Sequence, residues 1–394
     1  MTGKARTSSA EAQAASAEAQ AASAGPRAAS AGPRAASAGP RTSAAEARTA
    51  SAQARTPSAQ VRPTLASVAR AAAVSHQTVS NVINAPHLVR DETRRRVEAV
   101  IAETGYRPLK AAQTLRTRRS HLIAVIIPAP GEWRGELHNA FLHALTRRAQ
   151  KSGYRVLLFT AADDNEEINA YDQLLGDYTL DAFVLTGTHS GDRRTSWLRR
   201  KRIPFVTFGR PWGSTAGHPW ADVDGAYGDR IATEHLIAAG HRRVAFLGWP
   251  EGSDVGDDRR AGWQQACAAA GLPPEGQPRL DMEDDLAQGR AACARLLDAA
   301  EPPTAFVCTS DTIALGAWTE ITSRGLIPGT DAAVIGFDDS SAAAAVGLTS
   351  VAQPLDEVAD ACIVALSKLL SPSRRNPPYD RVLLKPRLVL RGSA

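Results

Sequence analysis

Short runs of apolar residues recur between residues 122 and 335, and longer stretches with helical spacing separate them. Such runs have the length of buried strands, and strands that alternate with helices predict parallel sheets with helices packed on their faces. The runs are Leu122–Ile127, Val156–Phe159, Ala182–Leu185, Phe205–Phe208, Val244–Leu247, Ala305–Cys308 and Ala333–Ile335. Ligands of open parallel sheets bind beyond the carboxyl ends of the strands. A binding site is therefore expected in the loops that follow these runs.

The composition is that of a globular protein with more than one domain. The chain has 394 residues, of which 43% are hydrophobic and 22% charged, so most of it can bury a core. It contains no run of about 18 apolar residues, so no membrane-spanning helix is expected. The first residues lack the apolar segment of a secretory signal, which favours a cytoplasmic location.

Positive charge is concentrated at the front of the chain. Residues 1–60 carry 7 basic and 3 acidic side chains, residues 61–121 carry 11 and 4, and the remainder carries 28 and 34. The formal net charge of +5 therefore hides a basic front and a mildly acidic body. This asymmetry favours a polyanionic partner, although a solvated charged surface gives the same count.

The first segment, residues 1–62, is a repeat that is not expected to fold. From Ser9 it reads SAEAQAA twice, then SAGPRAA twice and SAGPR, so its period is seven residues. The repeat lacks the large apolar side chains of a coiled coil, and its Gly-Pro pairs interrupt helices. We expect a disordered tail. Nonspecific attraction to DNA, an inert extension and an unused upstream start codon remain open as explanations for it.

Three short helical patterns follow in residues 63–107. Thr64 is expected to cap the first helix, a turn follows at 72–74, and Ser75 is expected to cap a second helix over 76–83. A third amphipathic helix is expected over 93–104. The side chains expected to face inward are Leu65, Val68, Ala69, Val79, Val82, Val97, Val100 and Ile101. The surface that remains is basic and rich in amides, which is typical of a helix-turn-helix that reads DNA, whereas a protein-docking module is the alternative.

Several stretches of the sequence resemble those of a known protein family. The chain contains TLASVARAAAVSHQTVSNVIN, ETRRRVEAVIAETGYRP and AAQTLRTRRSHLIAVIIP, and later HLIAAGHRRVAFLG, DDRRAGW, TSDTIALGA, AVIGFDD, LTSVAQP and RLVLRGS. In this order they resemble the lactose/galactose repressor (LacI/GalR) family of bacterial transcription regulators over residues 63–394. The resemblance implies an all-α helix-turn-helix head over 63–107, a hinge helix and linker over 108–120, and a core over 121–394. That core is an α/β fold of two Rossmann-like subdomains, similar to periplasmic binding proteins, with a ligand cleft between them.

The family pattern assigns DNA contacts residue by residue. His76, Gln77 and Asn81 match positions that read base edges in the major groove. Ser75, Thr78 and Ser80 suit phosphate contacts, which position the helix without reading sequence. In the hinge, Leu115 matches the leucine that family dimers insert into the minor groove, beside small Ala111 and Ala112 and basic Arg116, Arg118 and Arg119. The expected DNA-binding residues are Thr64, Ser75, His76, Gln77, Thr78, Ser80, Asn81, Ala112, Leu115 and Arg116.

Four positions depart from the family pattern. Ala73 stands at the usual turn glycine, which costs up to about 1 kcal/mol if the site needs a positive φ. Arg90 replaces the serine cap of the third helix, Leu109 replaces the polar residue that starts the hinge helix, and Asn81 stands where many members carry arginine. A pseudo-palindromic operator is therefore expected, but its bases cannot be copied from a relative.

Candidate ligand residues follow the carboxyl ends of the expected strands. Four tryptophans, at positions 133, 212, 220 and 249, lie within a few residues of such ends, and an indole face suits a sugar ring, although packing between loops is the alternative. Arg259 and Asp311 match the family's effector-binding motifs R-x-x-G-aromatic and D-x-x-A-x-G. His138, Arg210 and Asp284 occupy cleft positions by weaker alignment. The expected effector-binding residues are Trp133, His138, Arg210, Trp220, Trp249, Arg259, Asp284 and Asp311.

The residues contain no recognisable catalytic or cofactor motif. A phosphate loop, a dinucleotide fingerprint, a zinc-protease motif and a nucleophile elbow are all missing, and Asp338 and Asp339 fall in a family structural turn. The widely spaced Cys267, Cys293, Cys308 and Cys362 are expected to be buried thiols. We therefore expect no enzyme, no cofactor and no metal.

The resemblance implies a homodimeric regulator that binds double-stranded operator DNA and a small effector. RLVLRGSA has no leucine-heptad extension, which favours a dimer over a tethered tetramer. Closure of the cleft on its ligand is expected to melt or order the hinge helices, so that ligand and operator binding are coupled. A repressor induced by a sugar is favoured, whereas a corepressor, a phosphometabolite and a protein partner are the alternatives.

Overall fold

The computed structural model describes residues 63–107, 119–128, 135–213, 217–371 and 379–394. The expected tail over 1–62 and the hinge positions from Leu109 to Arg118, including Ala111, Ala112, Leu115 and Arg116, lie outside the described residues, as does Trp133.

The head contains three helices and a short 3-10 turn. These are α1 Leu65–Ala71, α2 His76–Asn84, η1 Pro86–Leu88 and α3 Asp91–Thr104. Thr64 and Ser67 form a capping box on α1, and Ser75 accepts from the Thr78 amide at the start of α2, so both expected caps are confirmed. The eight apolar side chains expected to face inward belong to one core cluster.

The start of the third helix and the turn after the first helix differ in how well they match the sequence predictions. The third helix begins two residues earlier than expected, at Asp91, where Asp91 and Glu92 fill the first turn and favour its positive end. Arg90 makes no capping bond, as expected from its side chain. Ala73 has φ +52°, so this turn does require the left-handed conformation that glycine adopts easily.

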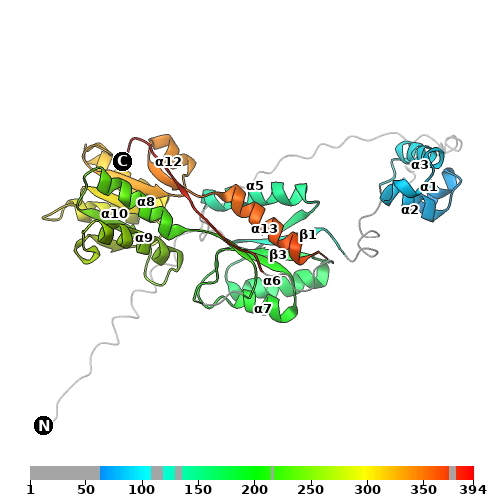
Figure 1. Cartoon of the computed structure of the whole chain (residues 1–394), viewed down its shortest axis with the longest axis horizontal. Helices are drawn as coiled ribbons and strands as arrows, with labels where there is room; N and C mark the ends of the chain where they lie inside the picture. The colour runs from blue at the N-terminus through cyan, green and yellow to red at the C-terminus, as the bar shows by residue number, and fades with distance from the viewer. Residues whose placement is uncertain (1–62, 108–118, 129–134, 214–216, 372–378) are drawn as a thin grey trace, which may run out of the picture. The chain divides into compact units, whose positions relative to one another are not determined.

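The first subdomain is a six-stranded parallel sheet in the order β11-β5-β4-β3-β1-β2. Its strands are β1 Leu122–Pro128, β2 Arg155–Ala161, β3 Ala182–Leu185, β4 Phe205–Phe208, β5 Trp220–Val223 and β11 Arg381–Leu384. The helices α5 Gly135–Lys151 and α13 Leu355–Leu369 cover one face, and α6 Asp164–Asp177 and α7 Arg193–Lys201 cover the other (Figure 1). Each face buries its own apolar cluster.

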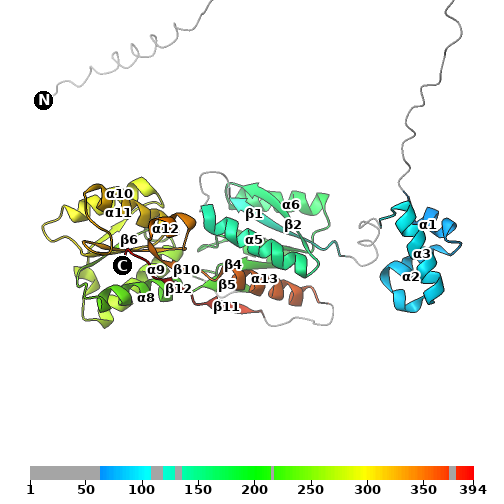
Figure 2. The same ribbon diagram turned by 90° about the horizontal axis from the view of Figure 1, so that it is seen from above.

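The second subdomain repeats this plan in the order β12-β10-β9-β8-β6-β7, with only β12 antiparallel to its neighbour. Its strands are β6 Val244–Gly248, β7 Arg279–Asp281, β8 Ala305–Cys308, β9 Ala333–Phe337, β10 Thr349–Ala352 and β12 Arg387–Val389. The helices α8 Gly225–Ala238 and α9 Val255–Ala269 pack on one face, and α10 Leu286–Leu297 and α11 Asp311–Ser323 on the other (Figure 2). The short η2 Pro274–Gly276 and α12 Ser341–Val346 complete it.

Short connections join the two sheets at three places. The chain passes from β5 to α8, from β10 to α13 and from β11 to β12. Each connection has only one or two residues outside the elements that it joins, so the ends of both sheets are held close together at this side. The fold class expected from the sequence is confirmed for the head and the core.

Other expectations about the core also hold. All seven apolar runs form strands, and the four cysteines are buried and free. Asp338 and Asp339 have φ of +110° and +54°, and Asp339 pairs with Arg391 at 2.6 Å, as a structural turn requires. Among the described helices, none combines the length and apolar character that crossing a membrane requires.

Candidate functional site

The outward side of α2 carries the three side chains expected to read base edges. His76 and Gln77 are exposed and Asn81 is half-buried. Gln77 Nε2 donates to Asn81 Oδ1 at 2.8 Å, so the two amides orient each other one helical turn apart. The pair still offers the Asn81 amide donors and the Gln77 carbonyl acceptor, which is the combination that an adenine edge requires.

The hydroxyls expected at phosphates have structural partners in the free head. Ser75 Oγ lies 2.9 Å from Thr78 Oγ1 and accepts from the Thr78 amide, while Thr64 Oγ1 accepts from the Ser67 amide. Arg96 on α3 donates to the Ala72 carbonyl at 3.1 Å and so fixes the turn between α1 and α2. The head therefore presents a preformed α2 whose orientation is set by caps and by α3.

A cleft lies where the carboxyl ends of both sheets meet. A cavity of about 100 Å³ adjoins one of about 340 Å³, because both are lined by His138, Val255 and the segment 186–188. Strand ends and helix N-termini from both subdomains supply the walls, as the rule for parallel sheets predicts. The first cavity is also lined by Leu137, Phe208, Gly209, Trp212, Asp222, Val223, Gly225, Asp258, Arg259, Phe337 and Gln353.

Arg210 bridges the two subdomains at the cleft. Its Nε lies 2.6 Å from Asp222 Oδ2 on β5, and its Nη2 lies 3.2 Å from Asp258 Oδ2 on α9. Nη2 also donates to the Val223 carbonyl, and the guanidinium lies 4.7 Å from the Trp212 ring centre. The donors of Arg210 thus have protein partners, so this residue shapes the cleft rather than offering an open cation.

Arg259 lines the cleft from α9. It is 5% exposed, donates to the Thr309 carbonyl and lies 3.7 Å from Asp338 Oδ1. Its guanidinium is 3.6 Å from the Phe337 ring centre and 5.3 Å from that of Trp249. Trp249 packs in the core beneath Arg259 and is not among the residues that line the cleft.

Asp311 and Asp284 lie behind the cleft wall. Asp311, the first residue of α11, is 3% exposed and accepts from Ser350 Oγ and the Ser340 amide at 2.6 Å each. Burial, with Asp338 nearby, raises its pKa to about 7. Asp284 accepts a hydrogen bond from Ser310. Both carboxyls brace the loops that follow strands of the second sheet.

The expectation that Trp220 lies in a loop after a strand is wrong. Trp220 is the first residue of β5, where it pairs with Thr207 and Arg381, and it is not among the residues that line the described cavities. Its strand was missed because Asp222 interrupts the apolar pattern. That interruption marks the cleft, since the Asp222 carboxylate is the partner of Arg210.

Several residues that line the cleft were not predicted from the sequence. Thr186 and Thr188 directly follow the run 182–185, so the strand-end rule gives their position without their chemistry. Val255 begins α9 after a loop, and Gln353 follows β10, a strand that the apolar pattern did not predict. Both residues reach the cleft through the fold of the chain.

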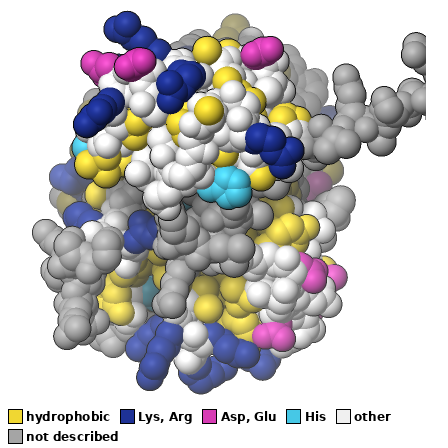
Figure 3. Space-filling view, turned by 90° about the vertical axis from the view of Figure 1, so that its right-hand side faces the viewer, with side chains coloured by type: hydrophobic (Ala, Val, Ile, Leu, Met, Phe, Trp, Pro, Cys, Tyr) yellow, Lys and Arg dark blue, Asp and Glu magenta, His cyan; other side chains and the backbone are white. Residues whose placement is uncertain are grey.

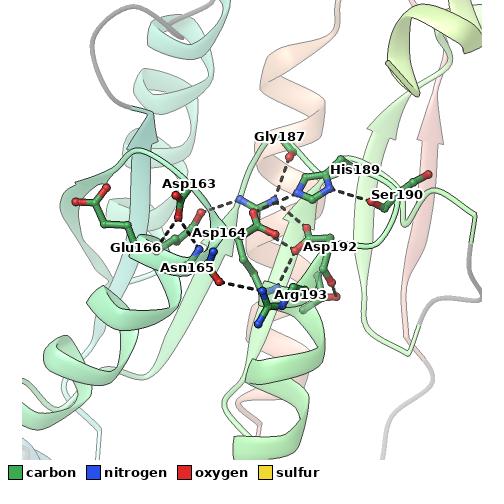
Figure 4. Close-up of polar contacts among 12 residues, drawn as sticks. Asp163, Asp164, Asn165, Glu166, Gly187, His189, Ser190, Asp192 and Arg193 are labelled. Carbon is green, nitrogen blue, oxygen red and sulfur yellow. Dashed lines mark hydrogen bonds and ion pairs between the residues drawn. The ribbon is translucent and has the colours of Figure 1, made fainter. Parts of the chain in front are cut away.

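A buried arginine forms one wall of the larger cavity. Arg194 is 4% exposed and pairs with Glu167 and Asp192 at 2.8 Å and with Asp164 at 3.2 Å. His189 Nε2 lies 3.2 Å from Asp164, and Figure 4 shows these groups converging between α6 and α7. Asp164, His189 and Asp192 are close enough to hold a metal ion, but the Arg194 guanidinium already pairs with both carboxylates.

Comparison with known proteins places both parts of the chain in one family. Residues 64–108 match the model of "Bacterial regulatory proteins, lacI family", and residues 233–394 match a periplasmic binding protein-like domain. The HTH-type transcriptional regulator AglR of Rhizobium meliloti (strain 1021) is 34% identical over 280 residues, covering 70% of this chain and 77% of that protein.

Two solved structures extend the comparison. The complex of the transcriptional regulator CelR with cellobiose is 29% identical, with a TM-score of 0.62, and covers 84% of this chain and all of that one. The lac repressor dimer bound to operator and an anti-inducer is 26% identical, with a TM-score of 0.70, and covers 84% of this chain and 98% of that one. The chain therefore belongs to the lacI family of bacterial regulatory proteins and is a DNA-binding transcriptional regulator, not an enzyme.

Proposed function

We propose that the protein is a homodimeric repressor that leaves its operator when a neutral sugar binds the cleft. The observation that carries the proposal is the cleft itself, which draws polar and aromatic side chains from both subdomains. A ligand that contacts both subdomains binds the closed arrangement more tightly than the open one, because in the open arrangement it contacts only one of them. Binding therefore shifts the equilibrium toward the closed arrangement.

The charges of the cleft favour a neutral ligand. Arg210 is already paired with Asp222 and Asp258, and Arg259 lies close to Asp338. An anionic ligand would have to compete with these carboxylates. A sugar needs none of those pairs broken, because its hydroxyls can share the carboxylate oxygens and its ring can pack on aromatic faces.

Specific side chains supply such contacts. The hydroxyl of Thr188, the amide of Gln353 and the imidazole of His138 line the cavity with Asp222, and the partly exposed Trp212 supplies an aromatic wall. Trp133 follows β1 in the chain and is proposed as a further ligand contact. Trp249, Asp284 and Asp311 are proposed to act through the residues that they support, Arg259 and the loops of the second sheet. The CelR complex with cellobiose is consistent with this ligand class.

On the DNA side, each head of the dimer is proposed to read one half of a pseudo-palindromic operator. His76, Gln77 and Asn81 would contact base edges, while Ser75, Thr78 and Ser80 would exchange some of their capping bonds for phosphates. The hinge residues Leu115, Ala112 and Arg116 are proposed to contact the minor groove at the centre. The lac repressor is a dimer when bound to its operator.

The experiment uses the purified full-length chain. A thermal-shift screen against neutral mono- and disaccharides identifies a ligand, and fluorescence anisotropy then measures affinity for an operator selected from random duplex DNA. A stabilising sugar should weaken operator binding about tenfold or more, within the usual range of allosteric coupling. A sugar that strengthens operator binding would identify a corepressor instead, and no response to any neutral sugar would refute the proposed ligand class.

A further inference from the structure

A second pocket lies within the first subdomain, between α6, α7 and the four residues Pro211, Trp212, Gly217 and His218. Its volume is about 570 Å³, and its lining residues fall between positions 165 and 218. The second subdomain, which begins at α8, contributes nothing to that lining. We call it the α6–α7 pocket. It shares Thr188, His189 and Trp212 with the walls of the cleft cavities, so the two sites adjoin each other, whereas its three lining arginines line neither cleft cavity.

This pocket contains arginines without carboxylate partners, whereas the arginines at the cleft are paired with carboxylates. Arg193, Arg199 and Arg200 line it, whereas Asp192, held by Arg194, is the only carboxylate among its described lining residues. Arg193 donates to Asn165, but within the described part of the chain Arg199 and Arg200 form no ion pair and no side-chain hydrogen bond. Figure 3 shows Lys and Arg side chains gathered along the lower edge of one face, at the level of α7 in Figure 1.

Close packing helps to set the position of Arg199. A Cβ atom built on Gly217 would lie 2.3 Å from the Arg199 guanidinium carbon, so the planar group lies directly against the backbone at Gly217. Below it, His218 is 4% exposed and its Nε2 lies 3.3 Å from Thr207 Oγ1. Burial lowers the pKa of His218 to about 4, so its ring is neutral at pH 7. The open positive charge therefore belongs to arginine.

Aromatic walls give the pocket an apolar surface beside these cations. Trp197 on α7 and Trp212 after β4 both line it. Among the described residues, the Trp212 Nε1 donor is buried without a hydrogen-bond partner. Indole faces pack on sugar rings, and a guanidinium binds phosphate oxygens through two parallel hydrogen bonds. The concave shape and the volume fit a small molecule rather than a nucleic acid strand.

We propose that the α6–α7 pocket binds a phosphorylated sugar, with Arg199 and Arg200 on the phosphate and the two indoles beside the ring. A phosphate monoester carries close to two negative charges at pH 7, which matches two arginines without carboxylate partners. The site would give the regulator a second metabolite input, distinct from the neutral ligand of the cleft but coupled to it. Its occupancy would act on the cleft through the shared segment of Thr188 and His189.

The test is isothermal titration calorimetry of the full-length protein with glucose 6-phosphate at low salt. The double variant Arg199→Gln/Arg200→Gln should bind this probe about tenfold or more weakly, because both charge-assisted contacts are removed. The matched control Lys151→Gln/Arg202→Gln removes the same charge from exposed positions of the same subdomain outside the pocket lining, and it should change affinity less than about twofold.

Further measurements locate the probe. Arg259→Ala alters the cleft and leaves the α6–α7 pocket intact, so it should not change binding of glucose 6-phosphate. Loss of binding in this variant would overturn the proposal, because the probe would then occupy the cleft. The proposal would also be overturned if the control double variant lost as much affinity for glucose 6-phosphate as Arg199→Gln/Arg200→Gln. Absence of binding to the wild-type protein would overturn it as well. Unchanged melting temperatures of the variants establish that their fold is intact.

Discussion

Asp254 holds Ser190 across the two subdomains with both of its carboxylate oxygens. The Ser190 amide donates to Oδ2 at 2.6 Å and its hydroxyl to Oδ1 at 2.7 Å. Asp254 has φ +52° and ψ −73°, an unfavourable conformation for a residue with a side chain. This contact between the subdomains is therefore made by a residue whose backbone is strained.

Replacing Asp254 separates the contact from the strain. Asp254→Ala should weaken sugar binding about tenfold, because hydrogen bonds to a charged group that hold the closed cleft are lost. Asp254→Gly should lose the same contact but be about 1 kcal/mol more stable than the alanine variant, because glycine tolerates positive φ. Urea unfolding and calorimetric titration with the identified sugar measure the two effects. Equal stability of the two variants would show that the backbone at 254 is not strained.

The turn between α1 and α2 offers a second test of backbone strain. Ala73 adopts φ +52°, whereas its neighbour Ala72 is buried and has φ −82°. Ala73→Gly should stabilise the head by about 0.5–1 kcal/mol, since it relieves the left-handed conformation. Ala72→Gly is the matched control and should destabilise the head. It removes a buried methyl group, and glycine raises the conformational entropy that the unfolded chain loses on folding. Hydrogen exchange of amides in residues 65–104 of the full chain reports both changes.

The sequence predicted the fold better than the details of the cleft, for a physical reason. All seven apolar runs formed strands, including the partly exposed edge strand β2. The other edge strands, β7, β11 and β12, are short and partly exposed. The inner strands β5 and β10 are interrupted by polar residues, Asp222 in β5 and Thr349 and Ser350 in β10, so their apolar patterns are weak. Thr186 and Thr188 were not named from the sequence, although both lie where the strand-end rule places ligand contacts. That rule could not show that Asp311 is held by Ser340 and Ser350, because those partners are 29 and 39 residues away.

Gln77 and Asn81 should act as one reading unit. Because Gln77 donates to Asn81, removing either amide also releases the other from its orientation. Gln77→Ala and Asn81→Ala should each weaken specific operator binding by about 1–3 kcal/mol, and the double variant should lose less than the sum. Nonspecific binding should stay the same. Anisotropy titrations with operator and scrambled DNA complete the double-mutant cycle, and strict additivity would mean that the two amides read bases independently.

Arg259 should be needed for the ligand response and not for DNA binding. It lines the cleft, whereas the adjacent Arg260 pairs with Asp257 at 2.7 Å and lies outside the cleft lining. Arg259→Ala should leave operator affinity within about threefold of the wild type and abolish release by the sugar, since one side of the closed cleft loses its buried donor. Arg260→Ala serves as the control and should respond normally. A preserved response in Arg259→Ala would remove this residue from the proposed ligand site.

Stability should fall as the pH rises through the range in which Asp311 ionises. Its pKa is about 7 in the folded chain and near 4 when unfolded, so the folded state binds the proton more tightly. The contribution of the protonated carboxyl is complete below about pH 4 and is lost as the pH approaches 7, a change of roughly 2–4 kcal/mol. Asp311→Asn does not titrate and keeps one oxygen acceptor, so it can accept from Ser340 or from Ser350 but not from both. Asp229, fully buried with its pKa also raised by burial, adds a similar slope to both proteins, so the difference between their urea-unfolding curves isolates Asp311. Parallel pH profiles for wild type and Asp311→Asn would show that the Asp311 carboxyl is ionised throughout.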